Sequence, residues 1–208
     1  MFTPYFLSFH TLSAAQRGRR TMVVGRWVVG PFISPFFLFF IPFPPLLHPI
    51  PMKLQILFTG RTTGNVFPAL IREYIQRLSH YLPTQVEEIP DLRNTKSLSE
   101  EQQKEREADM VLERLLPGDV LVLLDERGRE MTSREFSQWM EQRLQTVPKR
   151  LVLLIGGPYG FSPRIYEAAQ QKISLSKMTF SHQMVRLFLV EQLYRAFTII
   201  RGEPYHHD

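Results

Sequence analysis

Apolar residues beyond position 51 alternate between short continuous runs and the spacing of one helical face. Segments 54–59 (LQILFT), 120–124 (VLVLL) and 151–155 (LVLLI) have strand length, and the last two contain no polar residue, which is typical of strands covered on both faces. Weaker strand patterns lie at 85–89 and 173–176. After the first strand, the spacing i, i+3, i+4, i+7 predicts a helix that buries Phe67, Leu70, Ile71, Tyr74, Ile75 and Leu78.

Capping signals predict where the other helices begin and end. Segment 97–100 (SLSE) has capping-box spacing and opens a helix that Pro117-Gly118 closes. Segment 132–135 (TSRE) has the same spacing and begins a helix that runs through about residue 145. Each of these helices therefore lies between two predicted strands.

The last part of the chain contains two more predicted helices. Ser162 followed by Pro163 predicts a helix that extends to about residue 171. The final helix covers about 183–200, and Gly202 ends it. Strands that alternate with helices in this way predict one α/β domain over 52–208, with a largely parallel sheet flanked by helices.

Ligands of such sheets bind outside the carboxyl ends of the strands. Three of these ends are informative, at 124–128 (LDERG), 156–160 (GGPYG) and 175–180 (LSKMTF). Glycine has no Cβ, so a flat ligand can approach its backbone closely. A glycine turn after a strand is also ordinary turn geometry, and the residues alone leave both interpretations open.

Residues 1–51 differ in composition from the rest of the chain. They contain eight of the 16 prolines and nine of the 16 phenylalanines, and prolines interrupt the apolar stretch 31–51 too often for a membrane-spanning helix. We favour a start codon assigned too far upstream, with Met52 as the true first residue. A leader peptide or a membrane-directing segment is the alternative, and in either case we expect 1–51 to lie outside the fold.

Charge and cysteine content narrow the classes of function. The net charge of +5 depends on Arg17, Arg19, Arg20 and Arg26, because residues 52–208 hold 21 Lys and Arg against 20 Asp and Glu. Any contact with nucleic acid must therefore use local patches of positive charge. The chain has no cysteine, which excludes disulfides, a thiolate nucleophile and cysteine-based zinc sites. We expect a cytoplasmic protein without a metal.

Four segments resemble, in order, successive motifs of the RlmH family, which belongs to the SPOUT class of methyltransferases. They are 153–163 (LLIGGPYGFSP), 174–186 (SLSKMTFSHQMVR), 190–196 (VEQLYRA) and 203–207 (EPYHH). The opening MKLQILFTGR and the strand end LLDERG are also similar to that family. The resemblance covers essentially all of 52–208 and none of 1–51.

The resemblance implies a trefoil-knotted homodimer that uses S-adenosylmethionine as methyl donor, a known exception to the rule that chains avoid knots. Its implied substrate is N3 of a pseudouridine in large-subunit (23S) rRNA on the assembled ribosome. The donor would be held in the knot largely by backbone groups. The residues that match the family's donor-binding motifs are Leu124, Gly156, Leu175, Ser176, Lys177, Met178, Thr179 and Phe180.

Candidates for chemistry at the RNA are His182, Arg195, Tyr205 and His206. A histidine at a helix N-terminus favours the neutral, proton-accepting form, but a lone histidine there is equally typical of a surface or capping residue. Arg195 follows Glu191 by four residues, so an ordinary helix ion pair competes with contact to RNA. The resemblance makes Tyr205 and His206 a substrate-side element that completes the partner subunit's cleft.

Other readings remain open from the sequence. Arg93 and Lys96 are candidate phosphate contacts or, equally, residues of a solvated loop. Adjacent His206 and His207 do not indicate a metal, because neighbouring residues rarely face one ion and no carboxylate set accompanies them. The alternative function is a non-catalytic ribosome-associated factor that kept the knot. A membrane-anchored protein is a third class, which depends on residues 1–51 alone.

Overall fold

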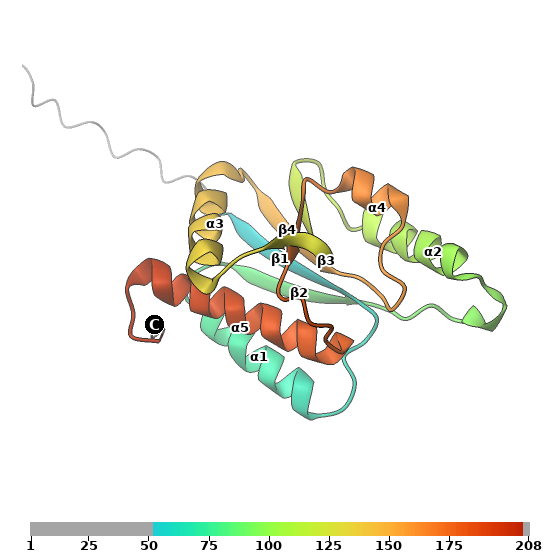
Figure 1. Ribbon diagram of the computed structural model, residues 1–208, viewed down its shortest axis with the longest axis horizontal. Coiled ribbons are helices and arrows are strands. Elements are labelled where there is room, and N and C mark those ends of the chain that lie inside the picture. Colours follow the sequence, from blue (N-terminus) through green and yellow to red (C-terminus); the bar gives the residue numbers. More distant parts are fainter. Residues whose placement is uncertain (1–51, 206–208) are drawn as a thin grey trace, which may run out of the picture. The chain divides into compact units, whose positions relative to one another are not determined.

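A computed structural model describes residues 52–205, which form a five-stranded sheet with helices on both faces (Figure 1). The strands lie in the order β2-β1-β4-β3-β5, and every pairing between them is parallel. The predicted α/β class with a parallel sheet is therefore confirmed. The strands are β1 Lys53–Thr59, β2 Thr84–Ile89, β3 Asp119–Glu130, β4 Arg150–Ile155 and β5 Gln171–Ser174.

Two apolar cores lie on opposite faces of the sheet, because side chains alternate along each strand. Phe58 and Leu153 point into the core beneath α1, α3 and α5, whereas Leu57 and Leu154 point into the core beneath α2 and α4. The apolar runs of β3 and β4 thus reflect burial on both faces, as predicted. The helices are α1 Val66–Leu78, α2 Glu100–Leu112, α3 Ser133–Thr146, α4 Pro163–Ala168 and α5 His182–Arg201.

Capping boxes begin both α2 and α3, but one of them is displaced from its predicted position. Thr132 accepts a hydrogen bond from the backbone of Glu135, whose side chain accepts one in return, so the prediction for α3 is confirmed. The predicted Ser97 cap of α2 is wrong: Ser99 forms the box with Gln102, because glutamine serves as well as glutamate at that position. Ser97 instead ends a short 3₁₀ turn over Thr95–Ser97.

The segment before the last helix also differs from the prediction. Helix α4 ends at Ala168 rather than near 171, because the backbone of Gln170 already donates a hydrogen bond to Leu121 of β3. Strand β5 consequently begins at Gln171, two residues before the predicted start at 173. At the other end, Gly202 caps α5 in the left-handed conformation (φ 67°), as expected for a helix-ending glycine.

Strand β3 continues well beyond the predicted 120–124 and pairs with β5 in two places. Ile173 of β5 pairs with Leu124 before residues 125–128, here called the β3 loop, and with Arg129 after them. A Cβ on Gly128 would lie 2.4 Å from the carbonyl carbon of Ile173, so no residue other than glycine fits there. This close passage is consistent with the threaded chain that the family resemblance implies.

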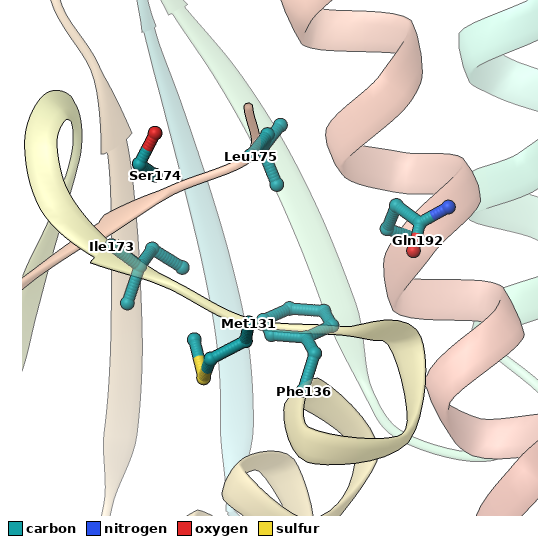
Figure 2. Close-up of a pocket in the computed structure, with 6 residues that line it drawn as sticks. All are labelled: Met131, Phe136, Ile173, Ser174, Leu175 and Gln192. Carbon is teal, nitrogen blue, oxygen red and sulfur yellow. The ribbon is translucent and has the colours of Figure 1, made fainter. Parts of the chain in front are cut away.

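A small void marks the place where the chain leaves the β3 loop (Figure 2). Its volume is about 40 Å³, which suits a few water molecules and not a larger ligand. We therefore treat it as a packing feature between β5, α3 and α5. Its lining consists of Met131, Phe136, Ile173, Ser174, Leu175 and Gln192.

Candidate functional site

A large cleft opens at the carboxyl ends of β3, β4 and β5. Its volume is about 730 Å³, which lies within the usual range of small-molecule sites. It joins three segments that are far apart in the sequence. All eight residues that the resemblance assigns to the methyl donor line this cleft, namely Leu124, Gly156, Leu175, Ser176, Lys177, Met178, Thr179 and Phe180.

The floor of the cleft is the glycine loop, residues 156–160, which follows β4. A Cβ on Gly156 would lie 2.8 Å from the ring of Phe161, and one on Gly157 would lie 2.6 Å from a carboxylate oxygen of Glu107. The backbone of Gly160 donates a hydrogen bond to the carbonyl of Gly157 at 3.1 Å, which closes the loop. Packing against the Phe161 ring therefore favours glycine at 156, whatever ligand the loop receives, whereas the Glu107 side chain could move away from a Cβ at 157.

Charged residues surround the mouth of the cleft. Asp125 accepts hydrogen bonds from the Tyr166 hydroxyl at 2.5 Å and from the backbone of Arg127 at 2.7 Å. Burial, followed by this contact with Asp125, raises the pKa of Tyr166 to about 12, so its hydroxyl keeps its proton. The cations Lys104, Arg127 and Lys177 also line the cleft, which gives it groups of both signs.

His182 is the first residue of α5 and lines the same cleft. Partial burial of the ring, with the positive charge of Arg186 one turn later, lowers the pKa of His182. The neutral imidazole predicted from the sequence is thus favoured, although burial contributes more to this than any other cause. A neutral ring in the cleft is chemically able to accept a proton.

Arg186 ties the start of α5 to the end of β1. Its side chain is only 2% exposed and donates to the carbonyl of Thr59 at 2.7 Å and to the hydroxyl of Thr62 at 2.9 Å. A buried guanidinium with these contacts fixes the loop after β1 against the helix that carries His182. Sequence reasoning did not single out Arg186, since an arginine in an amphipathic helix gives no sign of burial.

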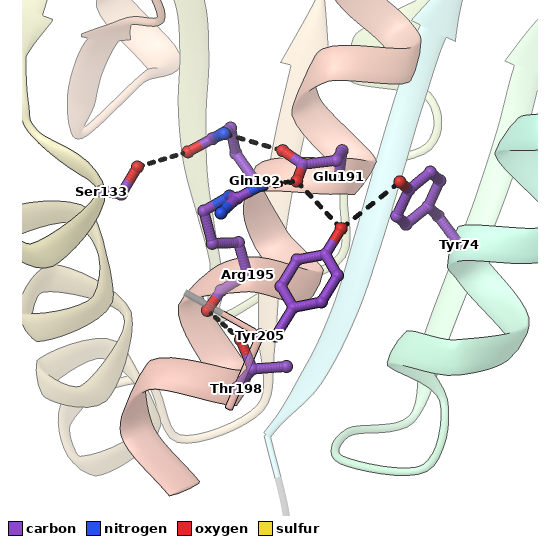
Figure 3. A network of polar contacts seen from close by, with 7 residues as sticks. All are labelled: Tyr74, Ser133, Glu191, Gln192, Arg195, Thr198 and Tyr205. Carbon is purple, nitrogen blue, oxygen red and sulfur yellow. Dashed lines mark hydrogen bonds and ion pairs between the residues drawn. The ribbon is translucent and has the colours of Figure 1, made fainter. Parts of the chain in front are cut away.

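Arg195 and Tyr205 belong to a second polar cluster, shown in Figure 3. The Glu191 carboxylate accepts from Arg195 at 2.5 Å and from the Tyr205 hydroxyl at 3.2 Å, and Tyr205 also approaches the Tyr74 hydroxyl at 3.5 Å. The Arg195 guanidinium lies 4.9 Å from the centre of the Tyr205 ring. The helix ion pair considered from the sequence is therefore present, and contact of Arg195 with RNA stays a prediction.

This cluster lies apart from the cleft. Arg195 follows His182 by thirteen residues, which corresponds to about 20 Å along α5. Neither Arg195 nor Tyr205 is among the residues that line the cleft. One chain consequently does not bring together the candidate catalytic residues, and His206 lies outside the described residues.

The structure also bears on three further predictions from the sequence. Arg93 and Lys96 are exposed between β2 and α2, and neither lines the cleft. Residues 52–205 contain no helix that is long and apolar enough to cross a membrane. Over the same range, no three histidine or acidic side chains are grouped in a way that could hold a metal ion.

Comparison with known proteins identifies the class. The family model described as "Predicted SPOUT methyltransferase" matches residues 52–206, and the chain belongs to this family. Relatives named "Ribosomal RNA large subunit methyltransferase H" include those of Parabacteroides distasonis (57% identical), Phocaeicola vulgatus (58%) and Porphyromonas gingivalis (54%). Each match spans 157 residues, which is 76% of this chain and 100% of the relative.

Proposed function

We propose that this protein transfers the methyl group of S-adenosylmethionine to N3 of a pseudouridine in the rRNA of the large ribosomal subunit. The cleft that gathers all eight expected donor-binding residues carries this proposal. The names of the relatives support large-subunit rRNA as the substrate. The choice of pseudouridine and of N3 follows from the resemblance to the RlmH family.

The residues of the cleft suit this chemistry. S-adenosylmethionine supplies an already activated methyl group, so the protein has to position it and to help N3 of the base lose its proton. We assign proton acceptance to His182, because its lowered pKa keeps the ring neutral at neutral pH. Arg195 would stabilise the imide anion or a neighbouring phosphate.

We further propose that two copies of the chain form the active unit. Arg195 lies about 20 Å from His182 along one helix and Tyr205 packs against Arg195, so both reach a cleft most simply from a second subunit. The tail of one subunit, including His206, would then complete the cleft of the other. A near-neutral domain cannot bind RNA strongly through charge alone, which favours an assembled ribosome with several contact surfaces as substrate.

The proposed reaction belongs in the cytoplasm, where ribosomes and the donor are present. We assign it to residues 52–208 and propose that residues 1–51 lie outside the methyltransferase domain. The alignment of the relatives supports this division, because their full length corresponds to 157 residues of this chain. A version of the chain that begins at Met52 and keeps full activity would agree with it, whereas loss of activity would contradict it.

Methyl transfer from labelled S-adenosylmethionine tests the proposal directly. The full chain is incubated with assembled ribosomes, or with free large subunits, from a strain that lacks the modification, and the rRNA is mapped by mass spectrometry. We expect label at N3 of one pseudouridine, with assembled ribosomes only. His182→Ala should abolish most of the label, and His80→Ala, in the exposed turn after α1, should not.

The same experiment distinguishes the proposed methyltransferase from the alternative function. A protein that binds donor and ribosomes but transfers no label would be a non-catalytic knotted factor. Label on another atom, or on free subunits equally well, would keep the methyltransferase class and overturn the proposed substrate.

A further inference from the structure

A carboxyl group lies directly behind the glycine loop. Glu107 of α2 packs against Gly157, where an added Cβ would lie 2.6 Å and 2.8 Å from its two carboxylate oxygens. Gly157 itself lines the cleft. The Glu107 carboxylate therefore touches a residue of the cleft wall, although Glu107 itself is not among the residues that line the cleft.

The surroundings of Glu107 leave its charge uncompensated. Within residues 52–205, its carboxylate takes part in no hydrogen bond or ion pair, and Arg164 of the adjacent α4 is engaged by Glu105 and Asp109 instead. Lys104 lies one helical turn away and lines the cleft. Burial, followed by the like charge of Asp91, raises the pKa of Glu107 to about 7.

The charge of the donor changes during methyl transfer. S-adenosylmethionine carries a positive sulfonium; when the bond from carbon to sulfur breaks, the electron pair stays on sulfur and neutral S-adenosylhomocysteine remains. The methyl carbon bonds to N3, and the proton of N3 passes to a base. A carboxylate close to the donor site distinguishes these two states, because it attracts the cation and not the neutral product.

We propose that Glu107 is a specificity-determining residue of the donor site, whose carboxylate favours positively charged S-adenosylmethionine over neutral S-adenosylhomocysteine. The inference rests on the proposed function, since it requires this donor in the cleft. This gives Glu107 a role in turnover. Its carboxylate attracts the positively charged donor, and that attraction is lost once the methyl group has been transferred. Partial burial of an unpaired acid next to a cleft is a recognised sign of function.

Binding measurements on the full chain test this role. The dissociation constants of both compounds are measured by calorimetry from pH 6 to pH 8.5. In the wild type, the preference for S-adenosylmethionine should increase roughly threefold to tenfold as Glu107 ionises. Glu107→Gln should show a constant preference, whereas Glu113→Gln, an equal charge change on the exposed far end of α2, should behave as the wild type.

A second readout needs no substitution. Because a bound cation favours the ionised carboxylate, binding of S-adenosylmethionine near pH 7 should release up to about half a proton, and S-adenosylhomocysteine should release less. Comparison of binding heats in two buffers measures this release. Equal release for both compounds, or an unchanged pH dependence in Glu107→Gln, would overturn the inference. Failure of the wild type to bind either compound would overturn the proposed function as well.

Discussion

Glu107 lowers the stability of the fold at neutral pH, because its carboxyl group ionises more easily in the unfolded chain. Its pKa rises from 4.5 to about 7 on folding, so the folded state binds the proton more tightly between these values. The free energy of unfolding therefore falls as the pH rises through this window, and the full loss is present above about pH 7. A residue that weakens the fold in this way fits a functional role better than a structural one.

Substitution of Glu107 should consequently stabilise the protein, in contrast to most changes at half-buried positions. We expect Glu107→Gln to raise the free energy of unfolding by roughly 1–3 kcal/mol at pH 8 and to change it little at pH 4. Urea unfolding at both pH values measures the difference. An equal effect at the two pH values would show that packing, and not the buried charge, is responsible.

His182 has the opposite dependence on pH. Its folded pKa lies below the ordinary value of 6.5, so the unfolded chain binds the proton more readily, and stability is lost as the pH falls below about 6.5. We expect the His182 ring to be neutral from pH 7 upward and to titrate below 6.5 in NMR spectra. A midpoint above 6.5 would remove the physical basis for a neutral proton acceptor.

At the scale of elements, the pairing of Ile173 with β3 on both sides of the β3 loop depends on the absence of a side chain at Gly128. Gly128→Ala places a methyl group 2.4 Å from the Ile173 backbone, and neither strand can yield without breaking its pairing with the other. We expect a loss of about 3 kcal/mol or more and weaker donor binding, because Leu175 to Phe180 follow β5 directly. Thermal unfolding and donor titration measure both effects.

Gly64→Ala is the matched control for this substitution. Unlike Gly128, Gly64 has a positive φ (+76°), but no atom lies near its absent Cβ, so its loss should be only about 1 kcal/mol. Similar losses for both variants would indicate that the contact with Ile173 is not the limiting one.

The sequence predicted the elements better than the contacts between them. Strand β4 and the capping box at Thr132 depend on local residues, and both were placed correctly. The extension of β3 to Glu130 was missed, because polar residues such as Arg127 and Arg129 become strand only by pairing with β5. Glu107 lies in a run of charged and amide residues at 100–107, and nothing local indicates that Gly157 packs on it.

At the scale of the whole molecule, the separation of His182 from Arg195 and Tyr205 makes a test of the dimer possible. If each cleft uses His182 of one subunit and Tyr205 of the other, His182→Ala and Tyr205→Ala homodimers are both inactive. After subunits of the two variants are mixed and exchanged, half of the dimers are heterodimers, and each of these has one intact cleft. We expect about one quarter of the wild-type transfer rate.

The mixing of the two variants can also contradict the proposed dimer. No recovery after verified subunit exchange would mean that each chain completes its own cleft, and the proposed arrangement of the tail would be wrong. Recovery well above one quarter would point to clefts that tolerate one of the two substitutions.

The double pairing of Ile173 with β3 also bears on the order in which the chain is synthesised. The ribosome makes β3 and β4 before β5, so both parts of β3 that pair with Ile173 exist before Ile173 itself is translated. Every candidate catalytic residue lies after that point in the chain. A nascent chain can therefore contain four of the five strands before any candidate catalytic residue has been made, and these residues can join the fold only after the final segment has left the ribosome.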